Sequence, residues 1–112
     1  MSEKRQDIRY RTIAHVRARG LFEGDALLKD ISVTGCRIET TVFINARPGI
    51  VYTLKIIPES ISKIAPFDLQ VENRWVNTES DSCEAGFLVK SSPGGKQFQR
   101  YVDYLAWRPS NT

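Results

Sequence analysis

The stretch "ALLKDISVTGCRIET", residues 26–40, contains two strand candidates separated by a turn. Residues 26–32 have the length and composition of a strand, and "VTG" at 33–35 ends it. Residues 36–40 then alternate, with Cys36, Ile38 and Thr40 on one side. Short strands at this spacing are typical of a small β-sheet protein.

Similar patterns lie on both sides of this stretch. Residues 12–18 place three apolar side chains on one face (Ala14, Val16, Ala18) and three others on the opposite face (Ile13, His15, Arg17). Residues 50–57, "IVYTLKII", are the strongest strand candidate by composition. Residues 58–66 lie between two prolines and predict a loop. Residues 68–76 and 84–90 predict two further strands, paired as a hairpin.

The last segment has the period of a helix. Apolar side chains recur at i, i+3, i+4 and i+7 (Phe98, Tyr101, Val102, Leu105). We expect a helix at about 96–107, capped by Ser91 or Ser92 and ended by Pro109. The chain therefore predicts a single, mainly β domain: a small six-stranded antiparallel β-barrel with a C-terminal α-helix that closes one end.

Composition narrows the classes of function. The 112 residues are 41% hydrophobic and 26% charged, with a net charge of +3, which is typical of a soluble domain that favours anionic partners. Two cysteines, a charged start and no apolar run of membrane-spanning length predict a cytoplasmic protein with free thiols and no membrane span. With one histidine and no catalytic or metal-binding motif, neither an enzyme nor a metal site is supported, and His15 is expected to be an ordinary strand residue.

Two short patterns could bind a ligand. In "DISVTG", residues 30–35, Asp30 and Ser32 point to one face of a strand, and Ile31 and Val33 point to the core. Gly35 can let a ligand approach the backbone. The alternative, which we favour for this hexamer taken alone, is that both polar side chains satisfy nearby backbone amides and the glycine turns the chain.

The second pattern is Arg5-x-x-x-Arg9. Guanidinium groups suit phosphate oxygens and the O6/N7 edge of guanine, and a spacing of four puts both on one side. The alternative is a solvated charge run at the terminus.

Taken together, the two patterns are more informative. Arg5-x-x-x-Arg9 before a strand, followed by Asp30-x-Ser32-x-x-Gly35, resembles the PilZ domain family over nearly the whole chain. "RWV" at 74–76 and "EAGFLV" at 84–89 also lie where that family has characteristic strands, although the glycine and phenylalanine are adjacent here.

This resemblance implies a receptor for the bacterial second messenger cyclic di-GMP, with no other cofactor. Arg5 and Arg9 would bind phosphate and the Hoogsteen edge of guanine. Asp30 and Ser32 would contact guanine and its surroundings, and Gly35 would keep the surface open.

Two further residues follow from the resemblance. Trp75 would lie against a guanine, with a core or barrel-rim tryptophan as the equal alternative. Lys4, directly before the first motif arginine, would favour capture of an intercalated ligand dimer, less well than arginine would. One or two ligands per chain both stay open.

The family match also predicts a mechanism. Residues 1–11 would form a flexible basic loop that orders over the barrel, residues 12–112, when ligand binds. The changed surface would act on a downstream protein partner in trans.

Two alternatives remain. A small basic barrel could bind single-stranded nucleic acid through Arg17, Arg19 and Arg37, with steep salt dependence, although few aromatics accompany these residues. A PilZ-fold adaptor could bind protein and no nucleotide, but such adaptors generally lack the motif residues that this chain keeps.

Overall fold

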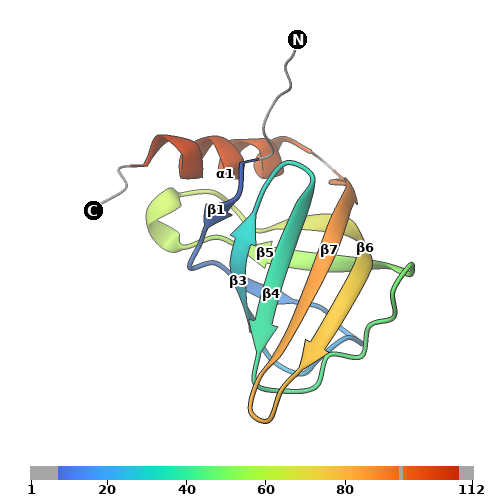
Figure 1. Cartoon of the computed structure of the whole chain (residues 1–112). Helices are drawn as coiled ribbons and strands as arrows, with labels where there is room; N and C mark the ends of the chain where they lie inside the picture. The colour runs from blue at the N-terminus through green and yellow to red at the C-terminus, as the bar shows by residue number, and fades with distance from the viewer. Residues whose placement is uncertain (1–7, 94, 109–112) are drawn as a thin grey trace.

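The computed structural model describes residues 8–93 and 95–108. The described residues form seven strands, one 3-10 helix and one α-helix (Figure 1). Their bounds are β1 Tyr10–Arg11, β2 His15–Arg17, β3 Ala26–Ile31, β4 Gly35–Thr40, β5 Val51–Ile57, η1 Ser60–Ser62, β6 Phe67–Thr78, β7 Cys83–Ser91 and α1 Lys96–Trp107.

Six of the strands close into an antiparallel barrel. The sheet order is β1-β3-β2-β5-β6-β7-β4, and a further pairing of β3 with β4 joins the last strand back to the sheet. The predicted six-stranded barrel with a C-terminal helix is therefore confirmed. Strand β1 lies outside the closed ring and pairs only with β3.

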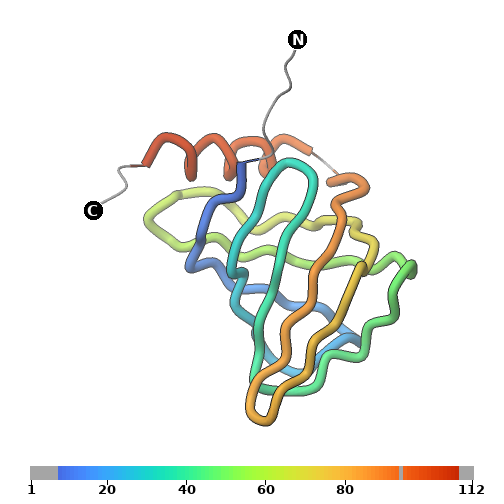
Figure 2. Tube along the Cα trace, in the orientation of Figure 1, coloured from blue at the N-terminus to red at the C-terminus, as the bar shows by residue number. Residues whose placement is uncertain are grey.

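The core follows the predicted alternation. Ala14, Val16 and Ala18 are buried, whereas Ile13 and the two side chains that follow on the same face are exposed. The inward side chains of β4 and β5 behave in the same way. The trace winds around this apolar interior (Figure 2), so any ligand site has to lie on the outer surface or at a rim.

The β6–β7 hairpin was predicted and is confirmed, and it is the longest pairing in the sheet. Its ladder is irregular at two places, between Gln70 and Val71 and between Asn73 and Trp75. The second irregularity changes which side chains face outward and shapes the candidate site described below.

Helix α1 lies across one end of the barrel, as predicted (Figure 1). Phe67 of β6 packs against Phe98 and Tyr101, with ring centroids 6.0 Å apart in both pairs. The predicted serine cap is wrong. Gly95 precedes the helix, and the Ser92 hydroxyl donates instead to the Asp68 carbonyl because a turn from Ser92 to Gly95 separates the serine from the helix start.

Two boundaries also differ from the prediction. Tyr10 and Arg11, placed in the flexible N-terminal loop, form β1, because Tyr10 packs against the core and both pair with β3. The predicted loop at 58–66 contains the 3-10 helix η1. Within residues 8–93 and 95–108, no helix combines the length and apolar character that crossing a membrane requires.

Candidate functional site

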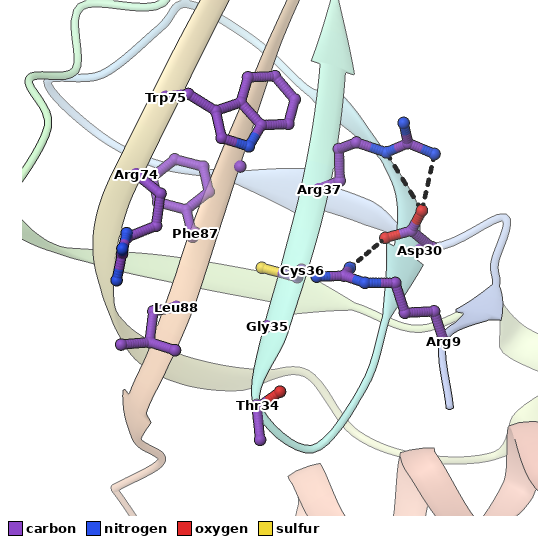
Figure 3. Close-up of a pocket in the computed structure, with 11 residues that line it drawn as sticks. Arg9, Asp30, Thr34, Gly35, Cys36, Arg37, Arg74, Trp75, Phe87 and Leu88 are labelled. Atoms are coloured by element: carbon purple, nitrogen blue, oxygen red, sulfur yellow. Dashed lines mark hydrogen bonds and ion pairs between the residues drawn. The ribbon is translucent and has the colours of Figure 1, made fainter. Parts of the chain in front are cut away.

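An open groove of about 560 Å³ lies on the outer face of the barrel, across β3, β4, β7 and β6 (Figure 3). Eleven residues line it: Arg9, Asp30, Thr34, Gly35, Cys36, Arg37, Arg74, Trp75, Gly86, Phe87 and Leu88. Its volume is within the usual range for a small-molecule site, roughly 300–1,000 Å³. The groove brings together Arg9, Asp30, Gly35 and Trp75 from the predicted set.

Strand register explains this arrangement. Asp30 of β3 pairs with Arg37 of β4, Arg37 with Gly86 of β7, and Gly86 with Trp75 of β6. Side chains in register on neighbouring strands share a face. This row therefore places the Asp30 carboxylate, the Arg37 guanidinium and the Trp75 indole on the outer surface, with Gly86, which has no side chain, between the last two.

Asp30 is held between two arginines. Arg9 Nη1 donates to Oδ1 at 2.7 Å, and Arg37 donates to Oδ2 through Nε at 3.1 Å and Nη2 at 2.8 Å. The Asp30 side chain is only 10% exposed, whereas both arginines are roughly half exposed. Charge-assisted bonds of this kind fix the carboxylate, and the trio keeps a net positive charge toward the groove.

Arg9 owes its position to β1 and to a glycine. It directly precedes Tyr10, which pairs with Ile31 of β3. A Cβ at Gly35 would lie 3.1 Å from Arg9 Nη2 and 2.9 Å from the Phe87 carbonyl oxygen. A side chain at Gly35 would therefore clash with the β7 backbone and crowd the Arg9 guanidinium, and the expectation that this glycine lets a ligand approach stays a prediction.

Ser32 and Val33 do not follow the predicted alternation. Ser32 is fully buried, and Val33, predicted to face the core, is 51% exposed. The reason is that β3 ends at Ile31 and the chain turns. The Ser32 hydroxyl oxygen accepts the backbone N–H groups of Thr34 and Gly35, at 3.2 and 3.1 Å. Ser32 therefore holds the turn beneath the groove and does not line it, as the favoured local alternative proposed.

Trp75 is not a core residue, because its side chain lies at the groove rim and is 41% exposed. The indole lies over Gly86, where an added Cβ would come within 2.4 Å of its ring atoms. The adjacency of Gly86 and Phe87 thus makes room for an outward tryptophan, a role that the sequence did not indicate.

Sequence reasoning missed Arg37 and Arg74 as groove residues. Arg37 had a usable signal, because it lies two residues past Gly35, on the strand that returns beside Asp30. Arg74 had none, because its outward position depends on the irregular ladder. The predicted ligand residues Lys4 and Arg5 lie outside the described residues.

Outside the groove, Arg17 and His15 interact with the carboxylate of Asp25. Arg17 donates to Asp25 at 2.6 Å, and this bond is the main reason that the pKa of Asp25 is lowered. His15 Nδ1 is 3.5 Å from the same carboxylate, on an exposed strand face as expected. No three His, Cys, Asp or Glu side chains in residues 8–93 and 95–108 gather as a metal site would require.

Both cysteines are free, as predicted, and both are buried. Cys36 lies at the floor of the groove, where burial raises the pKa of its thiol to about 12. The thiol is therefore neutral at physiological pH and adds no charge to the site.

Comparison with known proteins supports the fold. The structure of the inhibitor of motility MotI/DgrA from Bacillus subtilis matches 94% of this chain with a TM-score of 0.70 and 18% sequence identity. The chain spans about half (50%) of the length of that solved protein. No protein-family model and no curated protein sequence matches. The chain thus has a PilZ-like fold, in which the groove is the candidate ligand site.

Proposed function

We propose that the protein is a cytoplasmic bacterial receptor for cyclic di-GMP and not an enzyme. The observation that supports this most strongly is the Arg9–Asp30–Arg37 trio beside Gly35. It places two guanidinium groups and one carboxylate at a single groove, which is the set that a ligand with phosphates and guanines requires.

The trio suggests how the ligand would be bound. Arg9 would exchange its bond to Asp30 Oδ1 for a phosphate or the O6/N7 edge of guanine. The released Oδ1 would then accept from guanine N1–H and N2–H, while Arg37 keeps hold of Oδ2. Binding would replace one charge-assisted contact with several, and Trp75 would offer its indole face to a base.

The part of the predicted 1–11 loop that precedes β1 is proposed to complete the site. Arg5 would add a second guanidinium, and Lys4 would support a second ligand molecule. Closure of this segment over the groove would alter the surface that a protein partner meets. The output proposed is an effect on such a partner in trans.

Isothermal titration with cyclic di-GMP tests the function. The native chain should bind, and Arg9→Ala should bind roughly ten- to a hundredfold more weakly, because a charge-assisted contact contributes about 1.5–3 kcal/mol. Arg100→Ala is the matched control, because Arg100 is an exposed arginine on α1 that does not line the groove. Absence of binding by the native chain at micromolar ligand would reject the proposal.

A single-stranded oligonucleotide is the second ligand in the same assay. Tighter binding of the oligonucleotide than of cyclic di-GMP, with affinity that falls steeply with salt, would favour the nucleic-acid alternative instead.

A further inference from the structure

The irregularity in β6 is a bulge that adds one residue to the strand. Asn73 pairs with Phe87 and Trp75 with Gly86, two consecutive positions on β7, so Arg74 is the extra residue between them. Strand alternation should send Arg74 and Trp75 to opposite faces. Because of the bulge, both side chains are exposed and both line the groove.

Asn73 fixes the bulge from below. Its side chain is fully buried, and Nδ2 donates to the carbonyls of Trp75 and Gly86, at 3.1 Å each. Its own backbone N–H and carbonyl bond to Ile50 and Gly49, which precede β5. The two Nδ2 bonds tie the bulge to β7 and offset the cost of burying the donor end of the amide, whereas the buried Oδ1 has no hydrogen-bond partner among the described residues.

Arg74 is placed across the groove from Arg9. Strands β3, β4, β7 and β6 are successive neighbours, so three strand spacings, roughly 14 Å, separate β3 from β6, and the Arg9 side chain reaches across β3 to Gly35 of β4. Figure 3 shows Arg9 on the β3 side and Arg74 on the β6 side, with Cys36 and Gly35 between them.

The two arginines differ in their partners. Arg9 is bound to Asp30, whereas no carboxylate of residues 8–93 and 95–108 forms an ion pair with Arg74. An exposed guanidinium that lines a groove and has no acidic partner among these residues is available to an anion.

We infer that Arg74 is a ligand-binding residue, which takes the phosphate of the cyclic dinucleotide that Arg9 does not reach. This inference rests on the proposed function and extends it. The bulge held by Asn73 positions Arg74, and the ligand lies between two cationic sides. Arg74 thereby favours a ligand with two phosphates over one with a single phosphate.

The test is titration of cyclic di-GMP into the native chain, Arg74→Ala, Arg74→Lys and Arg100→Ala at low and high salt. Arg74→Ala should weaken binding about tenfold and make the salt dependence shallower, because one phosphate contact is lost. Arg74→Lys should recover most of the affinity, since a phosphate accepts a point charge. Arg100→Ala should match the native chain.

The outcomes separate the two proposals. If the native chain does not bind, the proposed function fails and this inference fails with it. If the native chain binds and Arg74→Ala has the same affinity and the same salt dependence, only the role of Arg74 is overturned. A loss in Arg74→Ala that Arg74→Lys does not recover also overturns the assignment to a phosphate. Arg74 is exposed, so its substitution should leave the fold intact. An unchanged circular dichroism spectrum of each variant checks this.

Discussion

Asp30 contributes ion pairs to the fold and lies in the candidate ligand site. Its carboxylate is nearly buried and holds two guanidinium groups that would otherwise repel each other. We therefore expect Asp30→Ala to lower the free energy of unfolding by about 1–3 kcal/mol, because three charge-assisted bonds are lost. Urea denaturation of this variant measures the loss.

The double variant Asp30→Ala/Arg37→Ala, compared with the two single variants, measures the interaction energy between these side chains. If the ion pair is the cause, the double variant should be more stable than the sum of the single losses predicts, with a coupling of about 1–2 kcal/mol. Strictly additive losses would mean that the contact observed between Arg37 and Asp30 contributes nothing to stability.

We expect substitution of Gly86 to be destabilising only when the Trp75 indole lies over it. An added methyl group would lie 2.4 Å from the indole, so Gly86→Ala should displace the ring. In a Trp107→Phe background, where Trp75 is the remaining tryptophan, this should change the emission maximum of the fluorescence.

The matched control for Gly86 is a background without the indole. Gly86→Ala should lower stability by about 1 kcal/mol or more in the native chain and by little in Trp75→Ala, because the overpacking is relieved. An equal cost in both backgrounds would place the obstruction elsewhere.

At the scale of the elements, period-2 alternation predicted the inward face wherever the ladder is regular. It placed Ala14, Val16 and Cys36 correctly. It was wrong for Val33, where β3 had already ended in a turn, and it had no means of placing Arg74, where a bulge adds a residue. Both irregularities border the groove. The turn is held by hydrogen bonds from the Thr34 and Gly35 amides to Ser32 that the alternation does not reveal, and the bulge depends on bonds from Asn73 to segments distant in the sequence.

Helix α1 is anchored by a partly buried hydrogen bond. The Tyr101 hydroxyl donates to Glu59 Oε1 at 2.6 Å, and Arg108 Nη1 lies 3.5 Å from the other oxygen of this buried carboxylate. Tyr101→Phe should lower the free energy of unfolding by about 1.5–3 kcal/mol, because a bond to a charged acceptor is lost.

Tyr104→Phe is the matched control for Tyr101. Its ring stacks on Tyr101 at 6.2 Å, but none of the hydrogen bonds in the described part of the chain involves its hydroxyl. Thermal unfolding of the two variants should show a large loss for Tyr101→Phe alone. Similar losses would mean that ring packing and not the Glu59 bond holds the helix.

At the scale of the whole molecule, β1 joins the groove to the helix. Arg9 precedes β1, and Arg108 at the end of α1 donates to the Arg11 carbonyl. The sequence predicted the barrel and the helix separately, because each has its own periodicity. It predicted that the helix closes one end of the barrel but not the connection through β1, because two residues are too few to show a strand pattern and the Arg11–Arg108 contact spans nearly the whole chain.

The whole-molecule stability should fall at alkaline pH. Burial raises the pKa of Cys36 from 9.0 to about 12, and burial followed by the Glu59 hydrogen bond raises the pKa of Tyr101 above 10.0. Both groups keep their protons longer in the folded state. The unfolded chain therefore releases protons first as pH rises, and this favours unfolding. The contribution of Cys36 to the free energy of unfolding should be fully present below pH 9. It should decrease from there to about pH 12, because the thiol ionises in the unfolded chain while it stays protonated in the folded one.

Two variants divide this pH dependence. Each released proton changes the free energy of unfolding by about 1.4 kcal/mol per pH unit. Cys36→Ala should therefore remove the part of the decline that begins near pH 9, and Tyr101→Phe the part that begins near pH 10. Lys29, whose pKa is raised chiefly by its hydrogen bond to Glu84, contributes equally to all three proteins and cancels in the comparison.

Urea denaturation at half-unit steps of pH measures the slope of the free energy of unfolding against pH. Because Cys36→Ala also removes packed atoms, its absolute stability should drop at every pH, and only the slope decides. A native slope retained in Cys36→Ala would show that the thiol at the groove floor ionises as readily in the folded protein as in the unfolded chain, so that solvent reaches it through the groove.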